Sequence, residues 1–168
     1  MAKLIILGAG GHGKVVADCA AATKQYHEIA FLDDGFPTRQ QHLVWPIIDK
    51  LSNWPEYMDK TDLAVAIGDN LARLNLYHQL ATAKARLPNI IHPRAVISPY
   101  TQLGAGNVIF ANAVINPGCK VANGVIINTA ASIDHDCTLA DGVHVSPGTN
   151  LAGNVSVGRL CWLGIGTR

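Results

Sequence analysis

The sequence predicts a protein of two parts, a small parallel α/β domain followed by a parallel β-helix. Strand-like and helix-like segments alternate through residues 1–90, and a six-residue apolar repeat fills residues 95–166 without insertion or skip. Such a period excludes an α-helix, whose apolar positions recur at three and four, and it is too regular for ordinary alternating strands. We therefore expect the α/β domain in residues 1–90 and the β-helix in residues 91–168.

The N-terminal part alternates short apolar runs with segments that have helical character. Two prolines in residues 87–93 mark a boundary before the repeat. Strand and helix at this spacing are typical of a small parallel sheet. Strands are expected at residues 3–7, 28–33 and 63–67, a glycine turn at 8–13, and helices at 14–22 and 70–85.

The repeat consists of hexads with an aliphatic residue at the third place and a small or slim residue two places earlier. Gly and Asn crowd the corners, where a tight turn needs positive φ. Three hexads form one coil, so each residue stacks over the one about 18 positions earlier in the chain. The third-place residues are Ile97, Leu103, Ile109, Ile115, Val121, Ile127, Ile133, Leu139, Val145, Leu151, Val157 and Leu163.

The composition argues against several classes of protein. A net charge of +1 and 15% charged residues provide no electrostatic basis for binding nucleic acid or a membrane. No apolar run approaches the length of a membrane span, so we expect a cytoplasmic protein. The four cysteines lack CxxC spacing, and we interpret all of them as structural rather than metal-binding or redox-active; Cys119, Cys137 and Cys161 share one inward repeat position.

A glycine-rich loop predicts a phosphate site in the α/β domain. Gly8, Gly10 and Gly13 fit G-x-G-x-x-G between a strand and a helix, where backbone amides favour a phosphate or pyrophosphate. Gly11 lies in the same loop, and His12 could donate to a phosphate oxygen.

Further polar residues are expected at the same sheet edge. Asp33 and Asp34 end the second predicted strand, where a carboxylate can accept from a ribose or sugar hydroxyl. Gly68 and Asn70 follow the third predicted strand and could complete the pocket. NAD remains an alternative ligand, although the domain is short for a two-half dinucleotide fold, and a glycine turn used only for packing is also possible.

A histidine between two carboxylates predicts acid–base chemistry in the repeat. Neutral imidazole can take a proton from an amine or hydroxyl, so His135 is a candidate base and Asp136 can fix its tautomer. Gly153 lies 18 positions after His135 and could offer its amide to a developing oxyanion. A surface histidine without a role is the alternative interpretation.

Two more polar residues are candidates near this histidine. His144 lies half a coil from His135, so the two point from different faces and could share a site only across a subunit boundary. Asn128 points outward at a corner and could orient a ligand or an imidazole. A structural role for either residue stays open.

Together these residues resemble one known group of enzymes. The chain is similar to the left-handed β-helix sugar acyltransferases, specifically the sialic acid O-acetyltransferase and bacillosamine-type nucleotide-sugar N-acetyltransferase family. The matching stretches are residues 8–13, 31–34, 66–70, 91–93, 128–129, 133–136, 144–146 and 152–154.

The resemblance implies a left-handed helix and acetyl transfer from acetyl-CoA, without a metal. It makes His135 the general base with Asp136 as its acidic partner, where Glu is more usual, and Gly153 the backbone donor to the thioester oxygen. His144 would lie near the acetyl group and the acceptor. A UDP-linked amino sugar would bind along Gly10, Gly11, His12, Asp33, Asp34, Gly68 and Asn70, and the family's homotrimers have active sites between subunits.

The resemblance also implies coils beyond those in this sequence. Thr167 and Arg168 begin a thirteenth hexad without a cap, so we expect a C-terminally truncated family member. The predicted function is acetyl transfer to an amino group, or less favourably a hydroxyl, of a nucleotide-activated sugar. The alternative is a non-catalytic nucleotide-sugar-binding β-helix protein that has lost its CoA-binding coils.

Overall fold

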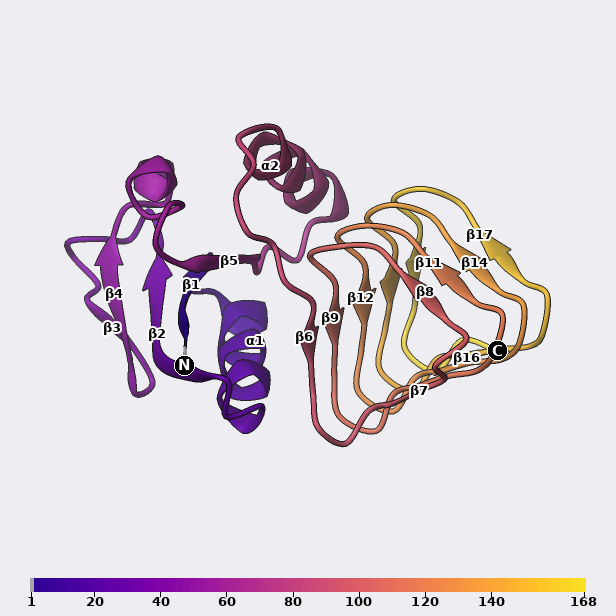
Figure 1. Cartoon of the computed structure of the whole chain (residues 1–168). Coiled ribbons are helices and arrows are strands. Elements are labelled where there is room, and N and C mark those ends of the chain that lie inside the picture. Colours follow the sequence, from indigo (N-terminus) through magenta and orange to yellow (C-terminus); the bar gives the residue numbers. More distant parts are fainter. Residues whose placement is uncertain (1) are drawn as a thin grey trace. The chain divides into compact units, whose positions relative to one another are not determined.

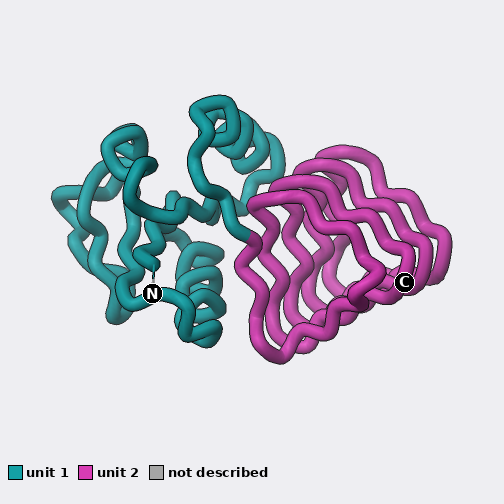
Figure 2. Tube along the Cα trace, viewed as in Figure 1, with its two compact units in different colours: residues 1–88 teal, residues 89–168 magenta. Residues whose placement is uncertain are grey.

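The structure, a computed structural model, describes residues 2–168 and consists of two compact units. The first unit ends at Pro88, and the second runs from Asn89 to Arg168 (Figure 2). The sequence placed this boundary after residue 90, and residue 1 of the expected first domain lies outside the described residues.

The first unit contains a five-stranded sheet in the order β3-β4-β2-β1-β5 (Figure 1). β1, β2, β4 and β5 are parallel, and only β3 runs antiparallel to its neighbour. Its elements are β1 (Ala2–Leu7), α1 (Gly11–Ala22), β2 (Tyr26–Leu32), β3 (Gln41–His42), β4 (Trp45–Asp49), the 3-10 helix η1 (Leu51–Glu56), β5 (Asp62–Val65) and α2 (Asn70–Thr82).

The predicted strands and helices all occur, and their apolar residues form the core of the unit. β1 lies between β2 and β5, and its last four residues are fully buried, as the near-continuous apolar run of a central parallel strand requires. The elements β3, β4 and η1 were not predicted. Pro46 lies inside β4 and Pro55 inside η1. Proline is disfavoured inside strands and helices, so the sequence around these two residues did not predict either element.

Two helix boundaries differ from the prediction. α1 begins at Gly11 rather than Lys14, because Gly10 is already the extended N-cap and its carbonyl accepts from the amide of Lys14 at 3.1 Å. α2 ends at Thr82 rather than Ala85, because Lys84 adopts a left-handed conformation with φ of 61°. The glycine loop is therefore half turn and half helix.

The second unit is a left-handed parallel β-helix with two-residue strands on three faces (Figure 1). The register confirms an 18-residue coil, since Ile126 pairs with His144 and His144 pairs with Trp162. The repeat also begins one hexad earlier than expected: β6 pairs in parallel with β9 and belongs to the same face. We call the face that contains β15 the His144 face. The three faces are β7 (Val96–Ile97), β10 (Val114–Ile115), β13 (Ser132–Ile133) and β16 (Asn150–Leu151); β8 (Gln102–Leu103), β11 (Lys120–Val121), β14 (Thr138–Leu139) and β17 (Ser156–Val157); and β6 (Ile90–Ile91), β9 (Val108–Ile109), β12 (Ile126–Ile127), β15 (His144–Val145) and β18 (Trp162–Leu163).

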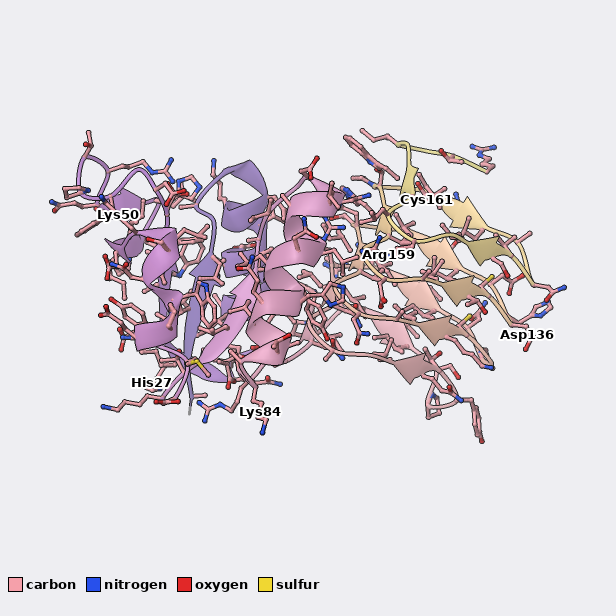
Figure 3. All side chains as sticks on the ribbon, turned by 90° about the horizontal axis from the view of Figure 1, so that it is seen from above. His27, Lys50, Lys84, Asp136, Arg159 and Cys161 are labelled. Atoms are coloured by element: carbon pink, nitrogen blue, oxygen red, sulfur yellow. The ribbon has the colours of Figure 1, made fainter. Side chains whose placement is uncertain are left out.

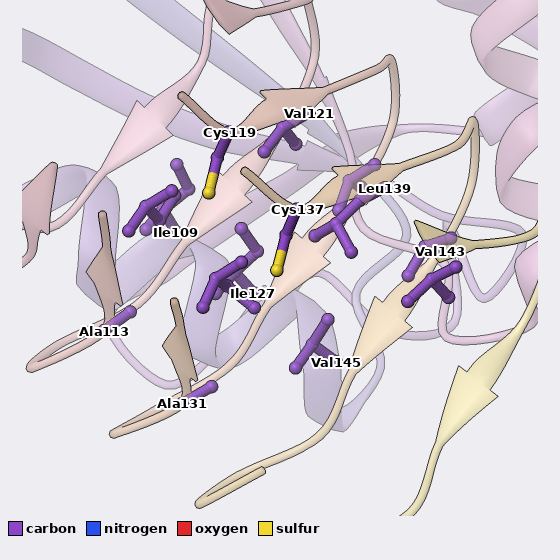
Figure 4. Close-up of a cluster of buried hydrophobic side chains, with 14 residues drawn as sticks. Ile109, Ala113, Cys119, Val121, Ile127, Ala131, Cys137, Leu139, Val143 and Val145 are labelled. Carbon is purple, nitrogen blue, oxygen red and sulfur yellow. The ribbon is translucent and has the colours of Figure 1, made fainter. Parts of the chain in front are cut away.

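The interior of the β-helix is the predicted column of aliphatic side chains with cysteines between them (Figure 4). The thiols of Cys119 and Cys137 are buried and donate to the carbonyls of Asp134 and Ala152, at 3.0 and 3.1 Å. Cys161 occupies the same place in its hexad but is exposed, so the burial expected at this repeat position is not found. Among the described residues no further strand stacks on β18, so this side chain lacks a covering coil.

Candidate active site

The glycine loop lies at the carboxyl end of β1, beside the segment that follows β5. Leu7 pairs with Val65 in a parallel register, so both strands end at the same edge of the sheet, as expected. A Cβ on Gly8 would approach the carbonyl of Ala66 at 3.0 Å, and one on Gly13 would overlap the carbonyl of Gly8. These two glycines are therefore required for close backbone packing.

The other glycines of this edge face open space. A Cβ on Gly10, Gly11 or Gly68 would meet no atom within 4 Å. The N-cap of α1 has no side-chain hydrogen bond, and its first turn contains no acidic residue. The first amides of a helix lack partners within the helix and carry the positive end of its dipole, so this end of α1 suits an anion.

Two side chains that the sequence analysis missed hold the carbonyls of this loop. Arg39 donates to the carbonyl of Ala9, and Nε2 of His42 lies 3.1 Å from the carbonyl oxygen of Gly10. Since a carbonyl only accepts, His42 is the donor. Both residues come from the poorly predicted stretch before β4, and only the fold reveals their proximity to the loop. His12 lies half-buried in the first turn of α1.

The two aspartates after β2 have different surroundings. Asp33 accepts from the amide of Ala9 at 2.7 Å and from the amide of Gly35 at 3.0 Å, so its carboxylate ties β2 to the glycine loop. Asp34 is exposed. Asp34 is therefore the more accessible acceptor for a ligand hydroxyl, while Asp33 retains lone pairs beside the loop.

A buried arginine organises the segment after β5. Arg73 is 2% exposed and donates to the carbonyls of Ile67 and Gly68, at 3.2 and 3.1 Å, and to Oδ1 of Asn70 at 2.8 Å. Burial lowers the pKa of Arg73 to about 10, which leaves it charged at neutral pH. Asp69 caps α2 by accepting from the amide of Ala72. Arg73 was also missed, although its position three residues after Asn70 on one helix face was a usable signal.

His135 lies at the corner between β13 and β14, in a short run of acidic residues. Its Nδ1 is 2.9 Å from Oδ2 of Asp136, and its backbone amide donates to Oδ1 of Asp134 at 2.8 Å. The amide group of Asn116, one coil earlier, donates to the same oxygen of Asp134 at 2.9 Å. Since the carboxylate of Asp136 accepts from Nδ1–H, the neutral ring carries its free lone pair on Nε2.

The corner is open to solvent, and its hydrogen bonds and charged groups shift the pKa values of His135 and Asp134 (Figure 3, where Asp136 is labelled). The side chain of His135 is 60% exposed, so a substrate can reach it. The hydrogen bond that His135 donates to Asp136 raises the pKa of His135 above its ordinary value, and the charge of Asp134 adds to this. The hydrogen bond from Asn116 lowers the pKa of Asp134, so that carboxylate stays ionised beside the histidine.

Two glycines make room for this pair of side chains. A Cβ on Gly153 would lie 2.5 Å from both Cε1 and Nε2 of His135, so the imidazole lies directly against the bare backbone of the next coil. A Cβ on Gly118, in the previous coil, would overlap the carboxylate of Asp136. The amide of Asn154 donates to the carbonyl of His135 at 2.8 Å, which joins the two coils at this point.

His144 lies on a different face, as the half-coil spacing predicts. Its Nε2 is 3.2 Å from the amide nitrogen of Asn128, so Nε2 accepts and Asn128 orients the ring. The ring also stacks on Trp162, with centroids 5.6 Å apart and planes 4° from parallel. The sequence analysis missed Trp162, although it lies one 18-residue coil after His144.

The described residues contain no group of three or more His, Cys, Asp or Glu side chains that could hold a metal ion. Within residues 2–168, no helix combines the length and apolar character needed to cross a membrane.

Comparisons with known proteins show similarity to sugar acetyltransferases along the whole chain. The family model of the PglD N-terminal domain matches residues 3–80. The UDP-N-acetylbacillosamine N-acetyltransferase of Bacillus subtilis is 33% identical over 112 residues, which are 63% of this chain and 50% of the relative. The chain thus spans about half the length of this curated relative.

Solved structures match over nearly all residues. The acetyltransferase domain of PglB from Neisseria gonorrhoeae, in complex with acetyl coenzyme A, is 42% identical with a TM-score of 0.94, covering 98% of this chain and 80% of that one. A mutant of perosamine N-acetyltransferase from Caulobacter crescentus, in complex with CoA and GDP-perosamine, is 37% identical with a TM-score of 0.91, covering 99% and 79%.

Proposed function

The chain belongs to the bacillosamine-type nucleotide-sugar acetyltransferases of the hexapeptide-repeat family, and we propose that it transfers an acetyl group from acetyl-CoA to an amino group of a nucleotide-activated sugar. The observation that carries this proposal is the His135–Asp136 pair packed against the bare backbone of Gly153. Acyl transfer by direct attack on the thioester uses a general base, a carboxylate that orients the base, and a backbone amide that binds the oxyanion.

In the proposed mechanism both substrates are bound when the amine attacks the thioester carbonyl. Nε2 of His135 takes the proton of the amine as the nitrogen–carbon bond forms, and Asp136 stabilises the imidazolium through Nδ1–H. The amide of Gly153 donates to the oxyanion of the tetrahedral intermediate. When the carbon–sulfur bond breaks, the thiolate of CoA leaves and can accept the proton from His135. No step needs a metal.

The nucleotide half of the substrate is assigned to the carboxyl edge of the α/β sheet. The open space at Gly10, Gly11 and Gly68 and the uncapped start of α1 support binding of a diphosphate there. His12 is proposed as a phosphate donor, and Asp33, Asp34 and Asn70 as partners for ribose or base. We expect a UDP-linked amino sugar.

The acceptor and the acetyl group are proposed to meet His144 and Asn128 at a subunit boundary. His135 and His144 occupy different parts of the β-helix, a corner and a face, so one copy of the chain does not bring them together. A homotrimer would let the His135 corner of one copy meet the His144 face of the next.

The proposal is tested by measuring CoA thiol release with acetyl-CoA and a UDP-linked amino sugar. His135→Ala should lower turnover by roughly 10²–10⁴, the contribution of a general base. His27→Ala is the matched control, since His27 is an exposed histidine on β2 (Figure 3) and its loss should leave turnover unchanged. Near-wild-type activity of His135→Ala would refute the assignment.

Thermal shift separates the catalytic proposal from a protein that only binds. A nucleotide-sugar-binding protein would be stabilised by the UDP sugar and not by acetyl-CoA, whereas the enzyme should respond to both. Stabilisation by NAD alone would favour the dinucleotide alternative.

A further inference from the structure

Trp162 is held in one orientation on the outside of the β-helix. It lies in β18, one coil after His144, and the two residues pair in register. The indole and imidazole rings stack with centroids 5.6 Å apart and planes 4° from parallel. The indole Nε1 donates to Oγ of Ser146 at 2.7 Å. The stack fixes the plane of the indole, and the hydrogen bond fixes its rotation within that plane.

Packing in the core of the β-helix does not explain why a tryptophan occupies this position. Trp162 is 70% exposed, and its position in the hexad points outward from the column of aliphatic residues. On the same face, the corresponding residues Ile90, Val108 and Ile126 are buried and aliphatic. An exposed indole gains little from burial, so its two directed contacts are its main structural consequence.

Both contacts converge on the surroundings of His144. Asn128 approaches the ring edge at Nε2, and Trp162 covers the ring face. The amide controls rotation of the imidazole about its own axis, and the indole controls its tilt. Ser146 follows His144 by two residues in the same coil, so the hydrogen bond ties the indole to the segment that carries the histidine.

We propose that Trp162 is a positioning residue that holds the imidazole of His144 in the orientation used for acetyl transfer. This inference rests on the proposed function, because it assumes that His144 contacts the acetyl group or the acceptor. Trp162 acts through His144 and needs no contact with substrate. Such positioning matters because the reaction rate falls steeply when the reacting groups depart from their required distance and orientation.

A double-mutant cycle tests this relation. Trp162→Ala should lower kcat/KM for the amino sugar about three- to tenfold, the size of one aromatic pair, whereas Trp162→Phe keeps a stacked ring and should recover most of it. In a His144→Ala background, Trp162→Ala should cost nothing more, since there is no ring left to position. If the two losses multiply instead, Trp162 acts independently and the inference is wrong.

Two controls exclude loss of folding and a general surface effect. The melting temperature of each variant should stay within a few degrees of wild type, because Trp162 is exposed. Tyr100→Ala removes another exposed aromatic side chain of the same unit and should leave kcat/KM unchanged.

A second readout does not depend on activity. A stacked imidazole quenches indole emission when it gains a proton. Acidification should therefore lower the tryptophan fluorescence of the wild-type protein by an increment that comes from the Trp162–His144 stack. This increment should be absent in both Trp162→Phe and His144→Gln. If the wild-type protein transfers no acetyl group but shows this increment, the proposed function fails and the stack stands. An identical pH response in wild type and His144→Gln overturns the stack itself.

Discussion

Replacing Gly153 with alanine is expected to displace the imidazole of His135 while leaving the fold intact. The new Cβ would lie 2.5 Å from Cε1 and Nε2, against ordinary contacts that begin at 3.4 Å. The ring must therefore retreat by about 0.9 Å, and a displacement near 1 Å at a reacting group can cost about 10² in rate. We expect kcat to fall by about that factor.

The same substitution should change stability little. Gly153 does not have a positive φ, so alanine fits its backbone, and the displaced His135 ring is largely solvent-exposed. Alanine also retains the amide proposed to bind the oxyanion, so any loss of rate reports the position of the ring. Steady-state kinetics with acetyl-CoA and the amino sugar, together with thermal unfolding, measure both effects.

Gly158→Ala is the matched control for this experiment. Its Cβ would meet only the sulfur of Cys161, at an ordinary 3.6 Å, so neither rate nor stability should change. Wild-type kcat in Gly153→Ala would show that the imidazole does not need the space over the glycine, and the proposed geometry of the base would then be refuted.

Four further substitutions follow from the structure. Asp136→Asn removes the main cause of the raised pKa of His135. Because the neutral ring is the proposed base, the acidic limb of the pH–rate profile should move to lower pH and the plateau should fall, whereas an unmoved limb would contradict the pairing. Gly13→Ala should destabilise the α/β unit, because the new Cβ overlaps a loop carbonyl, whereas Gly10→Ala should keep the melting temperature and weaken binding of the UDP sugar. Calorimetry measures the melting temperatures and titration measures the binding. Equal melting temperatures would argue against the packing role of Gly13. Arg73→Met removes the buried guanidinium that donates to the carbonyls of Ile67 and Gly68, and it should lower the free energy of unfolding by about 1–3 kcal/mol, measured by urea unfolding. An unchanged midpoint would show that water replaces these bonds.

The repeat shows why much of the β-helix could be predicted. Each hexad carries its own inward aliphatic residue and its own corner, so counting by 18 placed Gly153 against His135 and His144 on another face. Cys161 shows where counting fails, because the exposure of an inward position depends on a neighbouring coil. The first strand, β6, was missed because its hexad lies in the proline-containing boundary.

The α/β unit was predicted less completely. The glycine spacing predicted the tight turn between β1 and α1, since a tight turn and a closely packed helix require glycine at fixed positions in the sequence. Arg39 and His42, which hold the loop carbonyls, come from a segment about thirty residues away with no such mark. Asp33 was expected to face a ribose, and the fold engages its carboxylate with the loop amide.

The sequence alone therefore determined the fold class, the coil period and the positions of the candidate base and its neighbouring glycine. These features repeat or act locally along the chain, so a few residue types at fixed spacing specify them. Only the tertiary structure decided which ring nitrogen of His135 faces Asp136, that Arg73 and Arg39 donate to loop carbonyls of the α/β unit, and that Trp162 stacks on His144. Such contacts depend on side-chain directions and on segments from elsewhere in the chain, and spacing within the sequence does not encode either.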